Sequence, residues 1–239
     1  MTSRNGIRGF LARGRLGAFT SLFLLLLGFL LVPKLIPEVS PFRLLSPLFF
    51  TLLMVAAIQA SSEEPRDLRR AVVFALPALV LIWLSDAASP TITTLGAIAA
   101  AVFLTFVTTR ILGFILRARI VDTEVILAAL CIYLLVGLIW AEAYVAVAAN
   151  DPAAFTSLPT TGSSDLVYPV RRALTYFSYV TLTTVGYGDV SPVSGTAQSL
   201  AVLEAIIGQI YLVTMIARLV SLQVAHERGH GTHGRADGP

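Results

Sequence analysis

The run Thr-Leu-Thr-Thr-Val-Gly-Tyr-Gly-Asp at residues 181–189 carries the most specific pattern in the chain. An extended strand points its carbonyl oxygens alternately to opposite sides, so turning several of them to one line requires conformations that a Cβ resists. Gly186 and Gly188 tolerate those conformations. A line of such oxygens, with the Thr184 hydroxyl, could replace the water around a dehydrated monovalent cation. The predicted ion-binding residues are Thr184, Val185, Gly186, Tyr187 and Gly188, with the side chains of Val185 and Tyr187 packed away from the ion.

The composition indicates a membrane protein that would hold this run inside a bilayer. Of 239 residues, 56% are hydrophobic and only 13% are charged, which excludes a disordered or an ordinary soluble protein. The net charge of +3 comes from basic residues at the ends of apolar runs, so membrane topology explains it and we expect no nucleic-acid partner. The single cysteine, Cys131, is expected to be a small apolar packing residue.

Apolar runs of nearly 20 residues predict an all-α membrane protein with six spans. A signal peptide competes for the first run, but no cleavage pattern follows it, so we expect a retained helix. Residues 110–121 alternate apolar residues with arginines and are expected to lie along the membrane surface. A short helix at 169–182 precedes the glycine run. The expected spans are residues 16–32, 44–60, 71–88 (which contains Pro77), 91–109, 125–148 and 195–223.

These spans divide the chain into a four-helix membrane domain at residues 1–121, a second domain at 122–223 and a disordered cytoplasmic tail at 224–239. Asp122 is a candidate N-cap for the fifth span, and Trp140 and Tyr144 are expected to form its outer interfacial belt.

The placement of basic residues predicts the orientation. Six spans leave Lys34, Arg43, Arg171 and Arg172 on one side and the other 13 of the 17 Lys and Arg residues on the opposite side. By the positive-inside rule both termini are cytoplasmic and the glycine run faces outward, in a multi-pass protein of the plasma membrane.

From Asp122 onward, the order of span, short helix, glycine run and final span resembles the pore domain of tetrameric potassium channels. The resemblance implies a homotetramer that conducts K⁺ passively, with a re-entrant pore helix at 169–182 and a selectivity filter at 184–188. Such a pore is surrounded by lipid. The resemblance further implies K⁺ bound at Thr184, Val185, Gly186 and Tyr187, no cofactor beyond the permeant ion, and no enzymatic activity.

The resemblance also assigns residues that support the filter. Tyr176 and Phe177 stand where family members carry aromatic residues behind the filter, and Thr183 and Asp189 flank it. Many members have tryptophan at the position of Tyr176, where it holds the aspartate that corresponds to Asp189. Some members place a glutamate at the position of Val180.

The last span carries the residues expected at the cavity and gate. Gly208 stands where the family often has a hinge glycine, although a glycine that only allows close helix packing is an equal alternative. By resemblance, one helical face below it lines the cavity: Gln209, Leu212, Ile216 and Val220.

Glu204 is an ionisable residue inside the last span, where a charged carboxylate is costly. Its helical phase turns it away from the cavity. We expect it to hydrogen-bond behind the pore helix, either as a modulator that couples pH to opening or as a merely structural carboxyl.

The first 121 residues carry no regular series of arginines along a span, so we predict weak or no voltage sensing. An alternative function is a regulatory subunit that conducts little alone. The tail formally contains H-E-x-x-H at 226–230, with His233 nearby, which would suggest a zinc hydrolase or a metal-sensitive tail. Because glycines interrupt the segment, a disordered tail is preferred.

Overall fold

The computed structural model describes residues 17–32, 45–61, 65–85, 89–159 and 167–231. Within these ranges the regular elements are helices, and the β-type pairing consists of one isolated bridge between Phe155 and Pro192. The helices are Gly17–Val32, α2 Leu45–Ser61, α3 Pro65–Ser85, α4 Pro90–Arg117, α5 Thr123–Asn150, α6 Val167–Leu182 and α7 Gly195–Gly231.

Three of the described helices are long and apolar enough to cross a membrane: α4, α5 and the Gly195–Val224 part of α7. Two shorter apolar helices, Gly17–Val32 and Phe50–Ala60, lie before them. The chain is therefore a membrane protein. The count of six spans and the division into domains stay predictions.

Helix α4 corrects the predicted surface segment at 110–121. It continues without interruption to Arg117, because Ile111 and Ile115 are buried in the core and extend the apolar face by another turn. Arg218 of α7 donates to the carbonyls of Ile115 (3.1 Å) and Leu116 (2.7 Å) and so satisfies the end of the helix. Asp122 caps α5 as expected, accepting from Val125 N at 2.9 Å.

Two further boundaries differ from the predictions. Helix α3 begins at Pro65, because a proline at the first position and charged helix formers after it allow the helix to start before the apolar run; Pro77 does not end it. Helix α7 continues to Gly231, so the prediction of disorder is wrong for residues 224–231, and residues 232–239, including His233, lie outside the described residues. Gly229 and Gly231 do not end α7 earlier, because both lie in the last turn of this long helix.

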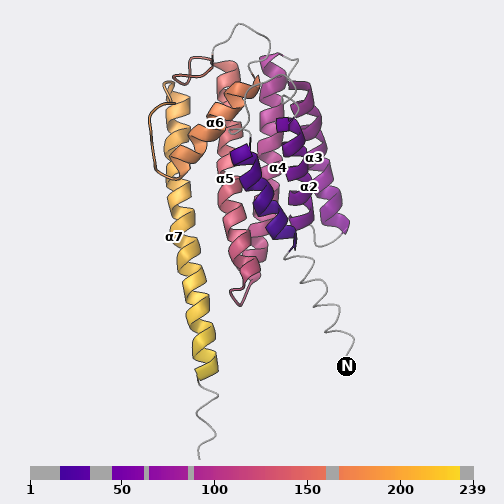
Figure 1. Ribbon diagram of the computed structural model, residues 1–239, viewed down its shortest axis with the longest axis vertical. Helices are drawn as coiled ribbons and strands as arrows, with labels where there is room; N and C mark the ends of the chain where they lie inside the picture. The colour runs from indigo at the N-terminus through magenta and orange to yellow at the C-terminus, as the bar shows by residue number, and fades with distance from the viewer. Residues whose placement is uncertain (1–16, 33–44, 62–64, 86–88, 160–166, 232–239) are drawn as a thin grey trace, which may run out of the picture.

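Helix α5 contacts α4, α6 and α7, while α2 and α3 pack against each other and against α4. Figure 1 shows α6 inclined between α5 and α7 near one end, while α7 continues past the other helices at the opposite end. A large apolar core joins the first helices to α5, and buried Cys131 belongs to it. A second cluster, which includes Tyr144, Phe155 and Phe177, lies behind α6.

Candidate ion-binding site

The segment after α6 turns back on the end of that helix. Thr184 N donates to Thr181 O at 3.0 Å, and the amides of Val185 and Gly186 both donate to Val180 O, at 3.0 and 3.3 Å. Carbonyls that would otherwise be unsatisfied at the helix C-terminus are thus paired with amides of the predicted filter. The backbone N–H groups at the start of the filter therefore face α6.

The backbone of the filter alternates in handedness. Thr184 has φ of 60°, Gly186 has φ of 60° and Gly188 has φ of 77°. Left-handed conformations at alternate residues rotate successive peptide planes so that neighbouring carbonyls point to one side, and they favour glycine. Thr184 adopts this conformation despite its branched side chain. The conformation costs about 1–3 kcal/mol, which the hydrogen bonds from the backbone amides to α6 offset.

The carbonyl oxygens of residues 184–187 accept no hydrogen bond from the described part of the chain. Every residue from 183 to 189 is exposed. Four consecutive carbonyls without a partner in the protein are available to accept from water or to coordinate a cation. The arrangement suits a cation, because only oxygens are presented.

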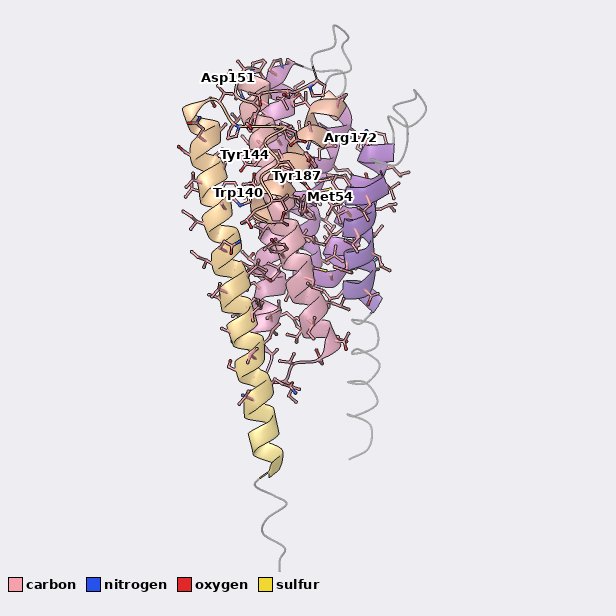
Figure 2. All side chains as sticks on the ribbon, turned by 60° about the vertical axis from the view of Figure 1, so that its left-hand side comes forward. Met54, Trp140, Tyr144, Asp151, Arg172 and Tyr187 are labelled. Atoms are coloured by element: carbon pink, nitrogen blue, oxygen red, sulfur yellow. The ribbon has the colours of Figure 1, made fainter. Side chains whose placement is uncertain are left out.

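Val185 and Tyr187 are exposed in the single chain, with exposed fractions of 50% and 72% (Tyr187 is labelled in Figure 2). Because the structure describes one chain, their packing away from the ion stays a prediction.

The aromatic residues at the end of α6 lie on two sides of the helix. Tyr176 hydrogen-bonds to Asp189, and this bond to the carboxylate raises the pKa of the Tyr176 phenol. Phe177 is buried and packs edge-on against Tyr144 and Phe155, with ring centroids 5.1 and 5.4 Å away. Tyr144 is fully buried, so its predicted place in an interfacial belt is wrong; packing against these rings wins over the membrane interface.

The loop after α5 holds the segment that follows the filter. Thr156 N donates to Ser191 O at 2.9 Å, and Val193 N donates to Ala154 O at 2.8 Å. These bonds flank the bridge between Phe155 and Pro192. Both ends of the filter are thus attached, one to α6 and one to this loop.

Two tyrosines that sequence reasoning missed fix α6 against α5. Tyr133 of α5 donates to Leu182 O, the last residue of α6, at 3.1 Å. Tyr179 of α6 donates in the opposite direction to Leu134 O at 2.5 Å, and its ring lies against Gly137. Their signal in the sequence was a hydroxyl inside an apolar run, which needs a partner when buried.

Glu204 lies behind α6 and is fully buried. Its carboxyl oxygens lie 2.5 Å from the Tyr144 hydroxyl and 2.5 Å from the Ser178 hydroxyl. The Ser178 hydroxyl also lies 2.7 Å from Gly137 O. One carboxyl group therefore joins α7 to both α5 and α6.

Gly208 lies one turn after Glu204 and faces the end of α6. A Cβ built on it would lie 2.6 Å from Leu182 Cδ1. This contact supplies a packing reason for the glycine; the hinge stays a prediction. Of the predicted cavity residues, Gln209, Ile216 and Val220 are exposed in the single chain and Leu212 is partly buried. Their role at a gate likewise stays a prediction.

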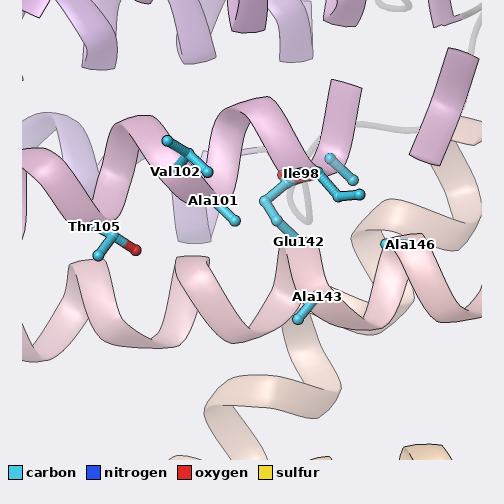
Figure 3. Close-up of a pocket in the computed structure, with 8 residues that line it drawn as sticks. Ile98, Ala101, Val102, Thr105, Glu142, Ala143 and Ala146 are labelled. Carbon is cyan, nitrogen blue, oxygen red and sulfur yellow. The ribbon is translucent and has the colours of Figure 1, made fainter. Parts of the chain in front are cut away.

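A buried ion pair was also missed. Arg171 of α6 donates to both carboxylate oxygens of Glu142 on α5, and both side chains are almost fully buried. Glu142 also lies at the edge of a groove of about 410 Å³ between α4 and α5, lined by alanines and aliphatic residues (Figure 3). The signal was an acid within an apolar span, which by default marks a site of interest.

Comparison with known proteins adds to this geometry. Residues 172–224, which hold most of α6, the filter and α7, match a family model described as ion channel. This segment is therefore similar to ion channels. The match supports a pore-loop channel of the potassium channel type and a channel rather than an enzyme.

Two curated relatives share part of the chain. It is 36% identical over 88 residues to Protein LctB of Bacillus caldotenax, which is 37% of this chain and 64% of that protein. It is 35% identical over 81 residues to Protein LctB of Geobacillus stearothermophilus, which is 34% of this chain and 59% of that protein. The chain thus spans less than two thirds of the length of each. No solved structure matches.

Proposed function

We propose that this ion channel is a potassium-selective pore built by four copies of the chain. The observation that carries the proposal is the row of four carbonyls without partners, on a backbone whose φ angles are positive at alternate residues. Such a row can replace the hydration shell of a K⁺ ion. We assign K⁺ to the carbonyls of Thr184, Val185, Gly186 and Tyr187.

The single chain supports an assembly with several copies. One row of oxygens cannot enclose an ion, whereas rows related by a rotation axis can. Alongside the exposed filter, α7 presents a largely uncovered apolar surface, which other copies and lipid would cover. Its most exposed large residues are Val202, Leu203, Ile206, Ile207, Ile210, Val213, Ile216 and Val220.

The position of α6 favours a cation. Its C-terminal end, where backbone dipoles sum to a partial negative charge, lies beside the filter. Conduction is then passive and needs no organic cofactor. In this proposal the filter lies at the outer face of the plasma membrane and both termini lie in the cytoplasm. We expect no nucleic-acid partner.

The arginines of the described helices before the pore are not arranged as a voltage sensor requires. Arg110 and Arg117 lie in the last two turns of α4, instead of being spaced along its membrane span. Arginines must lie within the field to sense it. We expect a conductance that depends little on voltage.

Reconstitution of the purified full chain tests the proposal. In a gradient of potassium against sodium, the reversal potential should follow potassium, and chemical cross-linking should stop at four copies. Wild-type protein that conducts both ions equally, or that is monomeric, contradicts the proposal. Four copies without current until another channel subunit is added would instead identify a regulatory subunit.

A matched pair of glycine variants makes the test specific to the filter. A Cβ meets nothing within 4 Å at Gly186 or at Gly195, but only Gly186 has a positive φ. Alanine in the left-handed conformation costs about 1–2 kcal/mol. Gly186→Ala should therefore lower potassium selectivity while Gly195→Ala retains it. Equal behaviour of the two variants would contradict a filter at this position.

A further inference from the structure

Glu204 is the point where the three helices around the filter meet. Its carboxyl lies in the bundle between α5, α6 and α7 with no exposed surface. Tyr144 Oη is 2.5 Å from Glu204 Oε2, Ser178 Oγ is 2.5 Å from Glu204 Oε1, and Ser178 Oγ is 2.7 Å from Gly137 O. Each of the three oxygen–oxygen contacts is of hydrogen-bond length.

Counting protons shows which state of the carboxyl fits these contacts. Three hydrogen bonds need three protons, but the two hydroxyls of Tyr144 and Ser178 supply only two. A backbone carbonyl supplies none, so Ser178 donates to Gly137 O. The proton between Ser178 and Glu204 must then come from Glu204. An ionised carboxylate would leave one of the contacts at Ser178 without a proton, with two oxygens facing each other.

Among the residues that the structure describes, the surroundings of Glu204 offer no charge that would favour the ionised form. The titratable groups that face Glu204 there are phenols: Tyr144 and Tyr133 from α5 and Tyr179 from α6. Arg171 of α6 forms its ion pair with Glu142 and not with Glu204. A buried carboxylate without a cationic partner is costly.

The position of the acid connects it to the filter. On α7, Glu204 and Gly208 are one turn apart; on α6, their contacts Ser178 and Leu182 are also one turn apart. Glu204 therefore sets the register of α7 against α6, and the predicted filter begins two residues after Leu182, at Thr184.

We propose that Glu204 is a neutral carboxylic acid that positions the selectivity filter, donating to Ser178, which donates to Gly137 O, while Tyr144 donates to the second carboxyl oxygen. Glu204 touches no permeant ion in this scheme and acts through α6. The proposal rests on the proposed function only for its effect on selectivity, since the state of the proton can be measured without any current.

Infrared difference spectroscopy of the purified full chain in lipid tests the proton. At neutral pH, the wild type should show a carbonyl stretching band of a protonated carboxylic acid that shifts in heavy water and is missing from Glu204→Gln. A wild-type spectrum with no band that the substitution removes would show that the carboxyl is ionised and overturn the proposal.

Conduction separates positioning from simple burial. Glutamine can donate to Ser178 and accept from Tyr144, so Glu204→Gln should keep the potassium reversal potential of the wild type. Glu204→Ala removes both bonds and should lower potassium selectivity about tenfold, as expected for unsatisfied buried groups. Equal loss in both variants would overturn the positioning role. If wild-type protein shows the acid band but conducts no potassium, the proposed function fails and the proton assignment stands.

A pH series adds a readout that packing alone does not give. Raising the pH until the Glu204 proton is removed should lower selectivity in the wild type. Glu204→Gln, which keeps all the surrounding phenols, should not respond. Identical pH curves for the two proteins would contradict the proposal.

Discussion

The contact between Gly208 and Leu182 gives a prediction that separates a packing glycine from a hinge. In Gly208→Ala, the new Cβ would lie 2.6 Å from Leu182 Cδ1, whereas carbon atoms pack at about 3.5–4.0 Å. Leu182 is fully buried, and its carbonyl is held by Tyr133, so the side chain has little room to move by the required ~1 Å. Overpacking of this size costs about 1–3 kcal/mol.

The gain in helix propensity offsets part of this cost. Alanine is favoured over glycine within a helix by about 1 kcal/mol. The net loss of stability in Gly208→Ala should therefore be about 1 kcal/mol, measured as a lower midpoint of thermal unfolding of the lipid-reconstituted protein. Because the displaced residue ends α6, potassium selectivity should fall with stability.

The double variant with Leu182→Ala is the matched control. Leu182→Ala alone leaves a cavity and should cost about 2–5 kcal/mol, but the Cβ at position 208 would partly fill that space. The two changes should then couple favourably by about 0.5–3 kcal/mol in a double-mutant cycle. A hinge predicts a different pattern: reduced opening in Gly208→Ala, unchanged selectivity, and no coupling to Leu182. Additive effects on stability would refute the packing argument.

Three further predictions concern contacts around the pore. Arg171→Ala leaves Glu142 buried without its cation and should lower stability, measured by thermal unfolding, by about 3–5 kcal/mol. Adding Glu142→Gln should recover much of that loss, and no recovery would show that the pair is not coupled. Arg218→Ala should increase amide hydrogen exchange in the last turn of α4, while Arg218→Lys retains part of the protection; unchanged exchange would contradict the capping role. Asp122→Ala should lower stability by about 1 kcal/mol and Asp122→Asn by less, since asparagine also caps helices; equal losses would exclude the cap as the cause.

Patterns that repeat along the chain predicted the helices well. The apolar runs placed the start of α7 at Gly195 and α2 within one residue of its observed start, because burial in lipid or protein depends on local composition. The wrong predictions concern helix ends, where charged residues and apolar residues indicate different structures. Arg110 and Arg117 suggested a surface segment, but Ile111 and Ile115 between them pack into the core and keep the helix intact.

Contacts between helices could not be read in the same way. The predicted filter stands out in the sequence because the proposed ion binding requires a particular backbone, which restricts the residue types locally. Tyr144 was placed at a membrane interface because aromatic residues are common there, whereas only the fold shows that its hydroxyl reaches Glu204. Partners separated by 60 positions, as these two are, leave no periodic trace in a single sequence.

The hydrogen bonds around α6 connect the predicted filter to residues outside it. Between helices in a bilayer, lipid is as apolar as leucine, so burial alone does not choose one register over another. Directional bonds can: Tyr133 and Tyr179 bond α5 and α6 to each other's backbone, and Glu204 adds α7. A shift of α6 by one turn would break all of them together. Since the filter amides bond to the last turn of α6, the same side chains also set where the four free carbonyls lie.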